Sequence, residues 1–125
     1  MDENADIPDA PILITGDEHF MRDALRQARK AAKQDEVPIG AVIVHEGRII
    51  ARAWNQVETL KDATAHAEML VMRAGALKLG NERLTGTQLF VSLEPCAMCA
   101  GAIGLARVAR LVFAADDPKG WAVLH

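Results

Sequence analysis

The chain has 125 residues, enough for one domain with one hydrophobic core. Half of the residues are apolar and a quarter are charged, which excludes wholesale disorder and collagen-like repeats. No apolar run approaches the roughly 20 residues of a membrane-spanning helix, and the chain opens with acidic residues instead of the basic start of an export signal. Two cysteines are too few for a disulfide scaffold. We therefore expect a cytoplasmic protein with no membrane association.

The net charge of −3 is unevenly distributed along the chain. Residues 1–18 contain six acidic residues and no basic one, so residues 19–125 carry a formal charge of +3. This weakly basic balance permits an RNA partner without requiring one, because proteins that grip a long duplex carry a much stronger basic stripe. We expect residues 1–18 to form a flexible acidic extension and residues 19–125 to form a single domain.

Turn and capping signals divide the domain into seven segments. In chain order, the predicted elements are a helix over residues 17–34, two strands over 39–45 and 48–54, a helix over 64–79, a strand over 89–93, a helix over 96–106 and a strand over 111–115. Asp17 and Thr64 are the expected N-caps of the first two helices, and Gly80-Asn81 ends the second. Glu46-Gly47 between the first two strands predicts a hairpin.

The two later strands are short apolar runs, typical of strands buried on both faces. Between them, Pro95 opens an almost wholly apolar helix in which Gly101 and Gly104 allow close packing. A hairpin followed by alternating helices and strands predicts an α/β fold with a mixed sheet and helices on its faces. An apolar stub over residues 121–124 follows a loop at 116–120, so we expect either a missing C-terminal element or a partner that covers the stub.

Metal-ligand residue types gather at the starts of two predicted helices. Cys96 and Cys99 are three residues apart and project from one helix face, where free N–H groups and the helix dipole favour thiolates. His66 lies at the start of its own helix, and helix starts gather at the carboxyl edge of an open α/β sheet. One imidazole and two thiolates fill three tetrahedral positions of a zinc ion and leave the fourth for water.

Glu68, two residues after His66, completes this constellation. Zinc with two thiolates is formally neutral, so it acidifies a bound water less than a cationic three-histidine site does. Such a centre needs a nearby base to take the proton and return it to the substrate. Glu68 is the expected base.

The two cysteines also permit two alternatives to catalytic zinc, a structural zinc site and a redox pair. A structural zinc site wants a fourth ligand, but the chain has no third cysteine and no histidine at finger-like spacing after the pair. A thioredoxin-like redox pair leaves His66 and Glu68 unexplained. The combination of His-x-Glu with Pro-Cys-x-x-Cys is a known signature of zinc-dependent deaminases, so catalytic zinc is the preferred interpretation.

Over residues 20–120 the sequence resembles the bacterial tRNA-specific adenosine deaminases, which convert a wobble adenosine to inosine. The matching stretches are EVPIGAVIV at 36–44, WN at 54–55, TAHAE at 64–68, LEPCAMCAG at 93–101 and DPKG at 117–120. Guanine and cytosine deaminases share the metal motifs, but the run from Leu93 to Cys99 and the Asp117 loop look more like the tRNA enzymes.

The resemblance implies a three-layer α/β/α cytidine deaminase-like sandwich, usually a homodimer, that acts on the tRNA anticodon loop. It implies that His66, Cys96 and Cys99 bind Zn²⁺ and that Glu68 shuttles protons. Substrate contacts are implied for Asn55, Ile39, Ala67 and Asp117. The family chain continues into a final strand and C-terminal helices, so we expect this domain to be C-terminally truncated.

Three functional hypotheses follow. The first is zinc-dependent hydrolytic deamination of adenosine to inosine at the tRNA wobble position. The second is deamination of a free nucleobase such as guanine or cytosine with the same centre. The third is a non-catalytic fragment or scaffold subunit, against which the presence of Glu68 argues.

Overall fold

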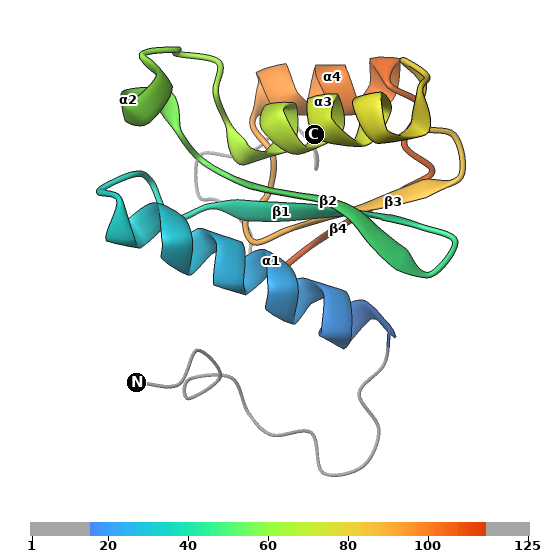
Figure 1. Cartoon of the computed structure of the whole chain (residues 1–125), viewed down its shortest axis with the longest axis horizontal. Coiled ribbons are helices and arrows are strands. Elements are labelled where there is room, and N and C mark those ends of the chain that lie inside the picture. Colours follow the sequence, from blue (N-terminus) through green and yellow to red (C-terminus); the bar gives the residue numbers. More distant parts are fainter. Residues whose placement is uncertain (1–15, 115–125) are drawn as a thin grey trace, which may run out of the picture.

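A computed structural model describes residues 16–114 of the chain. Its elements are α1 (Gly16–Lys33), β1 (Gly40–His45), β2 (Arg48–Trp54), α2 (Val57–Leu60), α3 (Ala67–Leu79), β3 (Thr87–Val91), α4 (Ala97–Leu105) and β4 (Arg110–Phe113), shown in Figure 1. Most of the predicted acidic extension, the Asp117 loop and the apolar stub at 121–124 lie outside the described residues. Gly16, Asp17 and Glu18, assigned above to the extension, form the first turn of α1.

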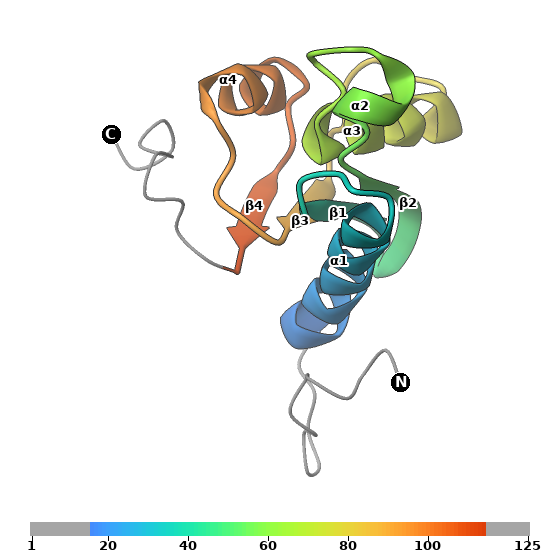
Figure 2. The same cartoon turned by 90° about the vertical axis from the view of Figure 1, so that its left-hand side faces the viewer.

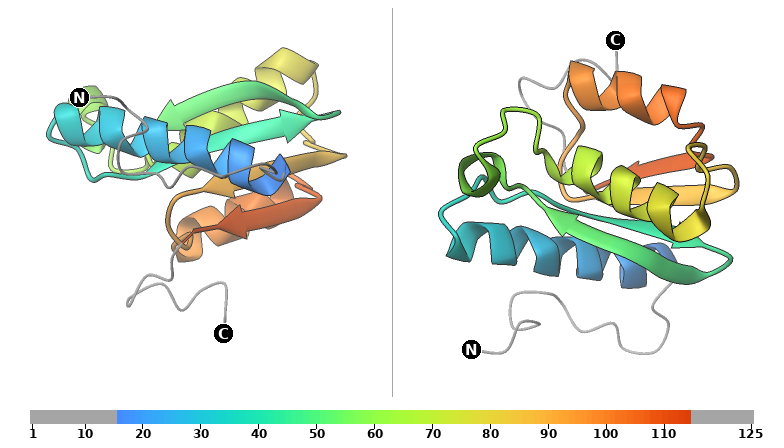
Figure 3. Two further views of the ribbon diagram at one scale, coloured as in Figure 1. Left: turned by 90° about the horizontal axis from the view of Figure 1, so that it is seen from below. Right: turned by 45° about the horizontal axis from the view of Figure 1, so that its top comes forward.

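The four described strands form one mixed sheet in the order β2-β1-β3-β4. β1 runs antiparallel to both β2 and β3, and β4 runs parallel to β3. Consequently β2, β3 and β4 share one direction, as the arrows in the left view of Figure 3 show, and their carboxyl ends lie at the same edge. The predicted mixed sheet is confirmed.

The β1–β2 hairpin forms where the sequence predicts it. Glu46 and Gly47 both have positive φ, 51° and 76°, which is the backbone of the type I′ turn that matches strand twist. Gly47 adopts this conformation without steric cost.

Helices cover both faces of the sheet, which confirms the three-layer α/β/α arrangement (Figures 1 and 2). On one face α1 packs over a cluster that includes Val42, Val44 and Phe90. On the other face Ile43 and Leu89 belong to the larger cluster beneath α3 and α4. Because alternate residues of a strand point to opposite faces, β1 is buried on both sides. No helix among residues 16–114 is long and apolar enough to span a membrane.

Three local expectations were wrong. Thr64 does not cap the second long helix: α3 begins at Ala67 with His66 at the N-cap, and Thr64 instead donates from its N–H and hydroxyl to Asp62 Oδ1 in a turn, at 2.8 and 2.7 Å. Cys96 lies at the N-cap of α4 and not within its first turn. The last strand is only half-buried, because β4 forms an edge of the described sheet.

Candidate metal centre and active site

Two helix starts meet at the carboxyl edge of the sheet. His66 precedes α3, which the chain reaches from the end of β2 through the single turn of α2. Cys96 precedes α4 just after β3, and Cys99 lies in the first turn of that helix. Since β2 and β3 point in the same direction, this topology brings His66 next to two cysteines that follow it by 30 and 33 residues in the chain.

The geometry of the three side chains fits one tetrahedral metal ion. His66 Nδ1 lies 3.6 Å from Cys96 Sγ and 3.5 Å from Cys99 Sγ, and all three ligand atoms are within 4.8 Å of one another. Zn–S and Zn–N bonds of about 2.3 and about 2.0 Å at a tetrahedral angle separate nitrogen from sulfur by about 3.5 Å. The predicted zinc ligands therefore converge with the spacing that zinc requires, through Nδ1 of the histidine.

Electrostatics also favours a cation at this place. Burial, followed by the negative charges of Glu68 and Cys96, raises the pKa of the Cys99 thiol far above its usual value. A thiolate at Cys99 is therefore costly in the protein alone, and a divalent cation removes that cost. Soft sulfur and imidazole donors match zinc in type as well as in distance.

Glu68 lies in the first turn of α3, on the helix whose start carries His66. Its side chain is 3% exposed, and its Oε1 atom is buried with no hydrogen-bond partner among the described residues. Burial raises the pKa of the Glu68 carboxyl, and a hydrogen bond from its own backbone N–H offsets part of that rise. A buried carboxylate oxygen without a partner is costly for folding and is typical of a functional site.

Asn55 connects the end of β2 to the start of α3. It is buried, and its Oδ1 atom accepts a hydrogen bond of 3.0 Å from the Ala67 backbone N–H. Its own N–H donates to the Ile39 carbonyl at 3.0 Å. Asn55 thus supplies the cap that His66, with no side-chain cap bond, does not supply, and its side-chain NH₂ group remains available to a substrate.

A pocket of about 370 Å³ opens beside the metal ligands. Its walls come from the α1–β1 loop, the end of β2, α2 and the segment before α3. The lining residues are Asp35, Glu36, Val37, Ile39, Asn55, Val57, Glu58, Ala63 and His66. Four of these residues are apolar and five are polar or charged, so the pocket offers both an apolar surface and hydrogen-bonding groups to a small ligand.

The cytidine and deoxycytidylate deaminase zinc-binding region, as a family model, matches residues 14–115. This chain belongs to that deaminase family. The tRNA-specific adenosine deaminase of Agrobacterium fabrum is 57% identical over 105 residues, which cover 84% of this chain and 69% of the relative. That of Bacillus subtilis is 54% identical over 107 residues, covering 86% of this chain and 66% of the relative. The chain spans about two thirds of the length of these bacterial relatives.

Solved structures agree with this assignment. One from a study of A-to-I editing by tRNA:A34 deaminases at the wobble position superposes with a TM-score of 0.80 and 57% identity, covering 82% of this deaminase chain and 78% of the other. The guanine deaminase of Bacillus subtilis superposes with a TM-score of 0.77 and 41% identity, covering 79% and 64%. The predicted family, the fold, the enzyme class and the zinc requirement are thereby confirmed.

Of the substrate residues predicted for the deaminase, Ile39 and Asn55 line the pocket together with His66. Ala67 is fully buried, and its N–H is bonded to Asn55, so it contributes to the site through its backbone. Asp117 lies outside the described residues. Three further pocket residues were not predicted from the sequence: Glu36, Val57 and Glu58. Of these, Glu36 opens one of the motifs shared with the tRNA enzymes.

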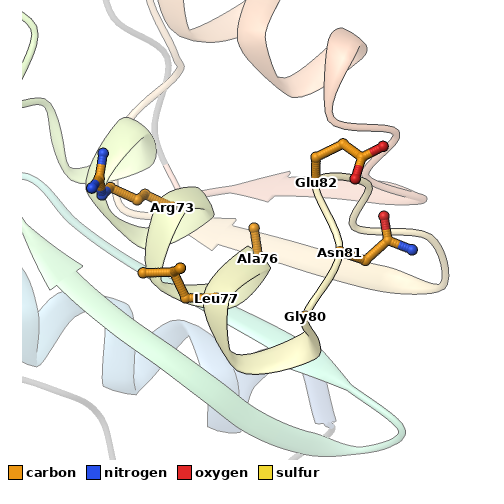
Figure 4. A pocket seen from close by; sticks show the side chains of 6 residues that line it. All are labelled: Arg73, Ala76, Leu77, Gly80, Asn81 and Glu82. Atoms are coloured by element: carbon orange, nitrogen blue, oxygen red, sulfur yellow. The ribbon is translucent and has the colours of Figure 1, made fainter.

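A second hollow, of about 420 Å³, lies at the far end of α3 (Figure 4). Its lining residues are Arg73, Ala76, Leu77, Gly80, Asn81 and Glu82. None of these is a predicted site residue, and the metal ligands lie at the opposite end of the helix. The chemistry therefore belongs to the pocket beside His66.

Proposed function

We propose that this deaminase converts adenosine to inosine at the wobble position of the tRNA anticodon loop. The observation that carries the proposal is the buried Glu68 carboxylate, whose Oε1 has no hydrogen-bond partner within residues 16–114, on the helix whose start provides His66 to the metal centre. The choice of substrate is supported by relatives named tRNA-specific adenosine deaminases that are 54–57% identical, against 41% for the guanine deaminase.

His66, Cys96 and Cys99 would hold zinc. When bound, zinc supplies a Lewis acid that makes water a nucleophile near neutral pH. Glu68 takes the proton that the attacking water loses as its oxygen bonds to C6 of adenine. It delivers that proton to the ring nitrogen N1. It then takes the remaining proton of the new C6 hydroxyl and transfers it to the departing amine, so that the C–N bond breaks, ammonia leaves and the C6 carbonyl of inosine forms. Because the two thiolates leave the centre formally neutral, this proton transfer depends on Glu68.

The pocket positions the base. Ile39 provides an apolar surface, and the free NH₂ group of Asn55 donates a hydrogen bond to the purine or its sugar. The target adenosine enters the pocket from an unpaired loop, in which extrusion of a base costs least. Asp117 contacts the RNA backbone near this base. The proposed place of action is the cytoplasm.

The exposed surface of helix α4 is the proposed interface of a homodimer. All nine of its residues are apolar or glycine, yet only Cys99 and Ile103 are buried. Leu105 is 84% exposed, and a Cβ added at Gly101 or Gly104 would meet no atom of the described residues within 4 Å apart from the helix's own backbone. An apolar helix face of this kind is typical of a protein interface. We expect sedimentation of the wild-type chain to give a dimer and Leu105→Glu to give a monomer; a monomeric wild type contradicts the assignment.

The function is tested with an anticodon stem-loop containing adenosine at the wobble position, with ammonia release and inosine as readouts. Glu68→Gln should lower kcat by a factor of about 100 to 10,000 while bound zinc is unchanged. Glu82→Gln, which alters an exposed carboxylate at the opposite end of α3, is the matched control and should retain activity. Substantial turnover by Glu68→Gln contradicts its role. Turnover of free guanine, cytosine or cytidine in place of the stem-loop identifies a nucleobase or nucleoside deaminase.

A further inference from the structure

Helix α2 is a single turn that no core packing holds in place. It spans Val57–Leu60, none of its residues is buried, and Gln56 at its N-cap makes no side-chain cap bond. The first backbone N–H groups of a helix have no partner within the helix and need one from elsewhere. For α2 that partner comes from a distant part of the chain.

The partner is the carboxylate of Glu36, in the loop between α1 and β1. Glu36 Oε1 accepts the Glu58 N–H at 3.1 Å, and Oε2 accepts both the N–H and the hydroxyl of Thr59 at 2.6 Å. The Glu36 residue is 5% exposed. A carboxylate at a helix N-terminus is favoured by the helix dipole, and hydrogen bonds to an ionised group are about twice as strong as neutral ones.

This contact joins the two walls of the pocket beside His66. Val37 and Ile39, from the loop that carries Glu36, line one wall, and Val57 and Glu58 of α2 line the other. A local cap from Gln56 would stabilise the helical turn without fixing its distance from the α1–β1 loop. A cap that comes from Glu36 fixes both.

We propose that Glu36 is a positioning residue that holds α2 against the α1–β1 loop and thereby sets the shape of the base pocket and its affinity for the flipped nucleotide. The proposal rests on the proposed function for the identity of the ligand, but the contact itself does not. Glu36 acts through α2 and takes no part in proton transfer. Its loss should therefore weaken substrate binding and spare the chemical step.

The test uses Glu36→Gln and Thr59→Val, singly and together, in the full chain. With the anticodon stem-loop, each single variant should raise KM, by about tenfold for Glu36→Gln, while kcat stays within about twofold. Bound zinc should be unchanged. Because both side chains act through one contact, the double variant should raise KM little more than Glu36→Gln alone.

Thr59→Ser keeps the hydroxyl and is the conservative control, and Asp23→Asn removes a carboxylate that bonds Arg52 on the α1 face of the sheet. Both should keep the wild-type KM. A fall in kcat with unchanged KM, a loss of zinc from Glu36→Gln, or additive effects in the double variant would each overturn the proposal.

Amide hydrogen exchange separates this inference from the proposed function, because it needs no substrate. The Thr59 amide should exchange at least about tenfold faster in Glu36→Gln than in wild type. An unchanged Thr59 exchange rate overturns the Glu36 contact whatever the substrate. Failure of the wild type to deaminate the stem-loop overturns the proposed function instead, and the exchange rate then judges the role of Glu36 alone.

Discussion

Alanine substitution of two glycines, one facing each side of the sheet, should change Tm with opposite signs. Gly40 begins β1 beneath α1, and a Cβ added there would overlap the Ala24 carbonyl oxygen, the Ala28 backbone nitrogen and Gln27 Cβ. Since two of these are backbone atoms of α1, no change of rotamer relieves the overlap and the helix has to move. Gly75 of α3 faces the other side of the sheet, where an added Cβ would lie 3.5 Å from Ile43 and Leu84, an ordinary contact.

The magnitudes follow from these contacts. Overpacking a core ordinarily lowers the free energy of unfolding by about 1–3 kcal/mol. Because Gly40→Ala displaces a backbone, we expect a loss of about 3 kcal/mol. For a domain of this size about 4 °C of Tm corresponds to each kcal/mol, so Tm should fall by about 12 °C. Gly75→Ala should raise Tm by about 2–4 °C, because a glycine inside a helix costs about 0.5–1 kcal/mol relative to alanine.

Thermal unfolding followed by far-UV circular dichroism measures both shifts. Protein and zinc concentrations are held fixed, because dimerisation and bound metal change the apparent Tm. A Gly40→Ala variant that does not fold is the extreme of the expected outcome. In that case Gly75→Ala, which packs against β1 from the other face, shows that the assay resolves a change in Tm. An unchanged or raised Tm in Gly40→Ala would refute the close packing of α1 on β1, and a lowered Tm in Gly75→Ala would contradict the ordinary contacts expected there.

Three further predictions concern the site. Cys96→Ala should lose bound zinc, measured by mass spectrometry, and lower Tm; retained zinc rejects Cys96 as a ligand. Zinc binding at pH 7 should release at least one proton, from the Cys99 thiol whose pKa burial raises, and calorimetry in buffers of different ionisation enthalpy counts it; no release contradicts a protonated Cys99. Hydrogen bonding, chiefly by the Thr59 hydroxyl, lowers the pKa of the Glu36 carboxyl below its usual value in the folded state. The ionised carboxylate stabilises the folded state fully above the pKa that Glu36 has in the unfolded chain, and this stabilisation is lost as the pH falls through its pKa in the folded state. The Tm difference between wild type and Glu36→Gln should therefore narrow from about pH 5 downward. A Tm difference that does not change with pH refutes the lowered pKa of Glu36.

The parts of the fold that depend on neighbouring residues were predictable from the sequence. Glu46-Gly47 specifies a type I′ turn, and the strand over 48–54 has the bounds that the hairpin signal predicts. Gly80 ends α3 in the left-handed conformation, as expected for a helix C-cap. The three metal ligands were predictable for the same reason, because their spacing lies within two short motifs.

The helix starts at the site were not predictable by the same means, because their caps come from a distance. Thr64 is a good N-cap by residue type, but the cap of α3 is Asn55 at the end of β2. Likewise α2 was missed altogether, since Gln56 gives no local capping signal and its cap is Glu36. Rules that compare residues three or four positions apart do not detect a cap that is twelve or twenty-three positions away.

These distant caps have a consequence for catalysis. The start of α3 carries both His66 and Glu68, so whatever fixes that turn fixes the proposed proton-transfer group, Glu68, relative to the proposed metal ligand His66. Asn55 fixes it through the Ala67 N–H while lining the pocket with the rest of its side chain. A nucleotide that accepts a hydrogen bond from the Asn55 NH₂ group therefore binds to the residue that orients Glu68, the proposed general base. Loss of the Asn55 carboxamide should then lower kcat as well as weaken binding, whereas loss of the Glu36 contact should weaken binding alone.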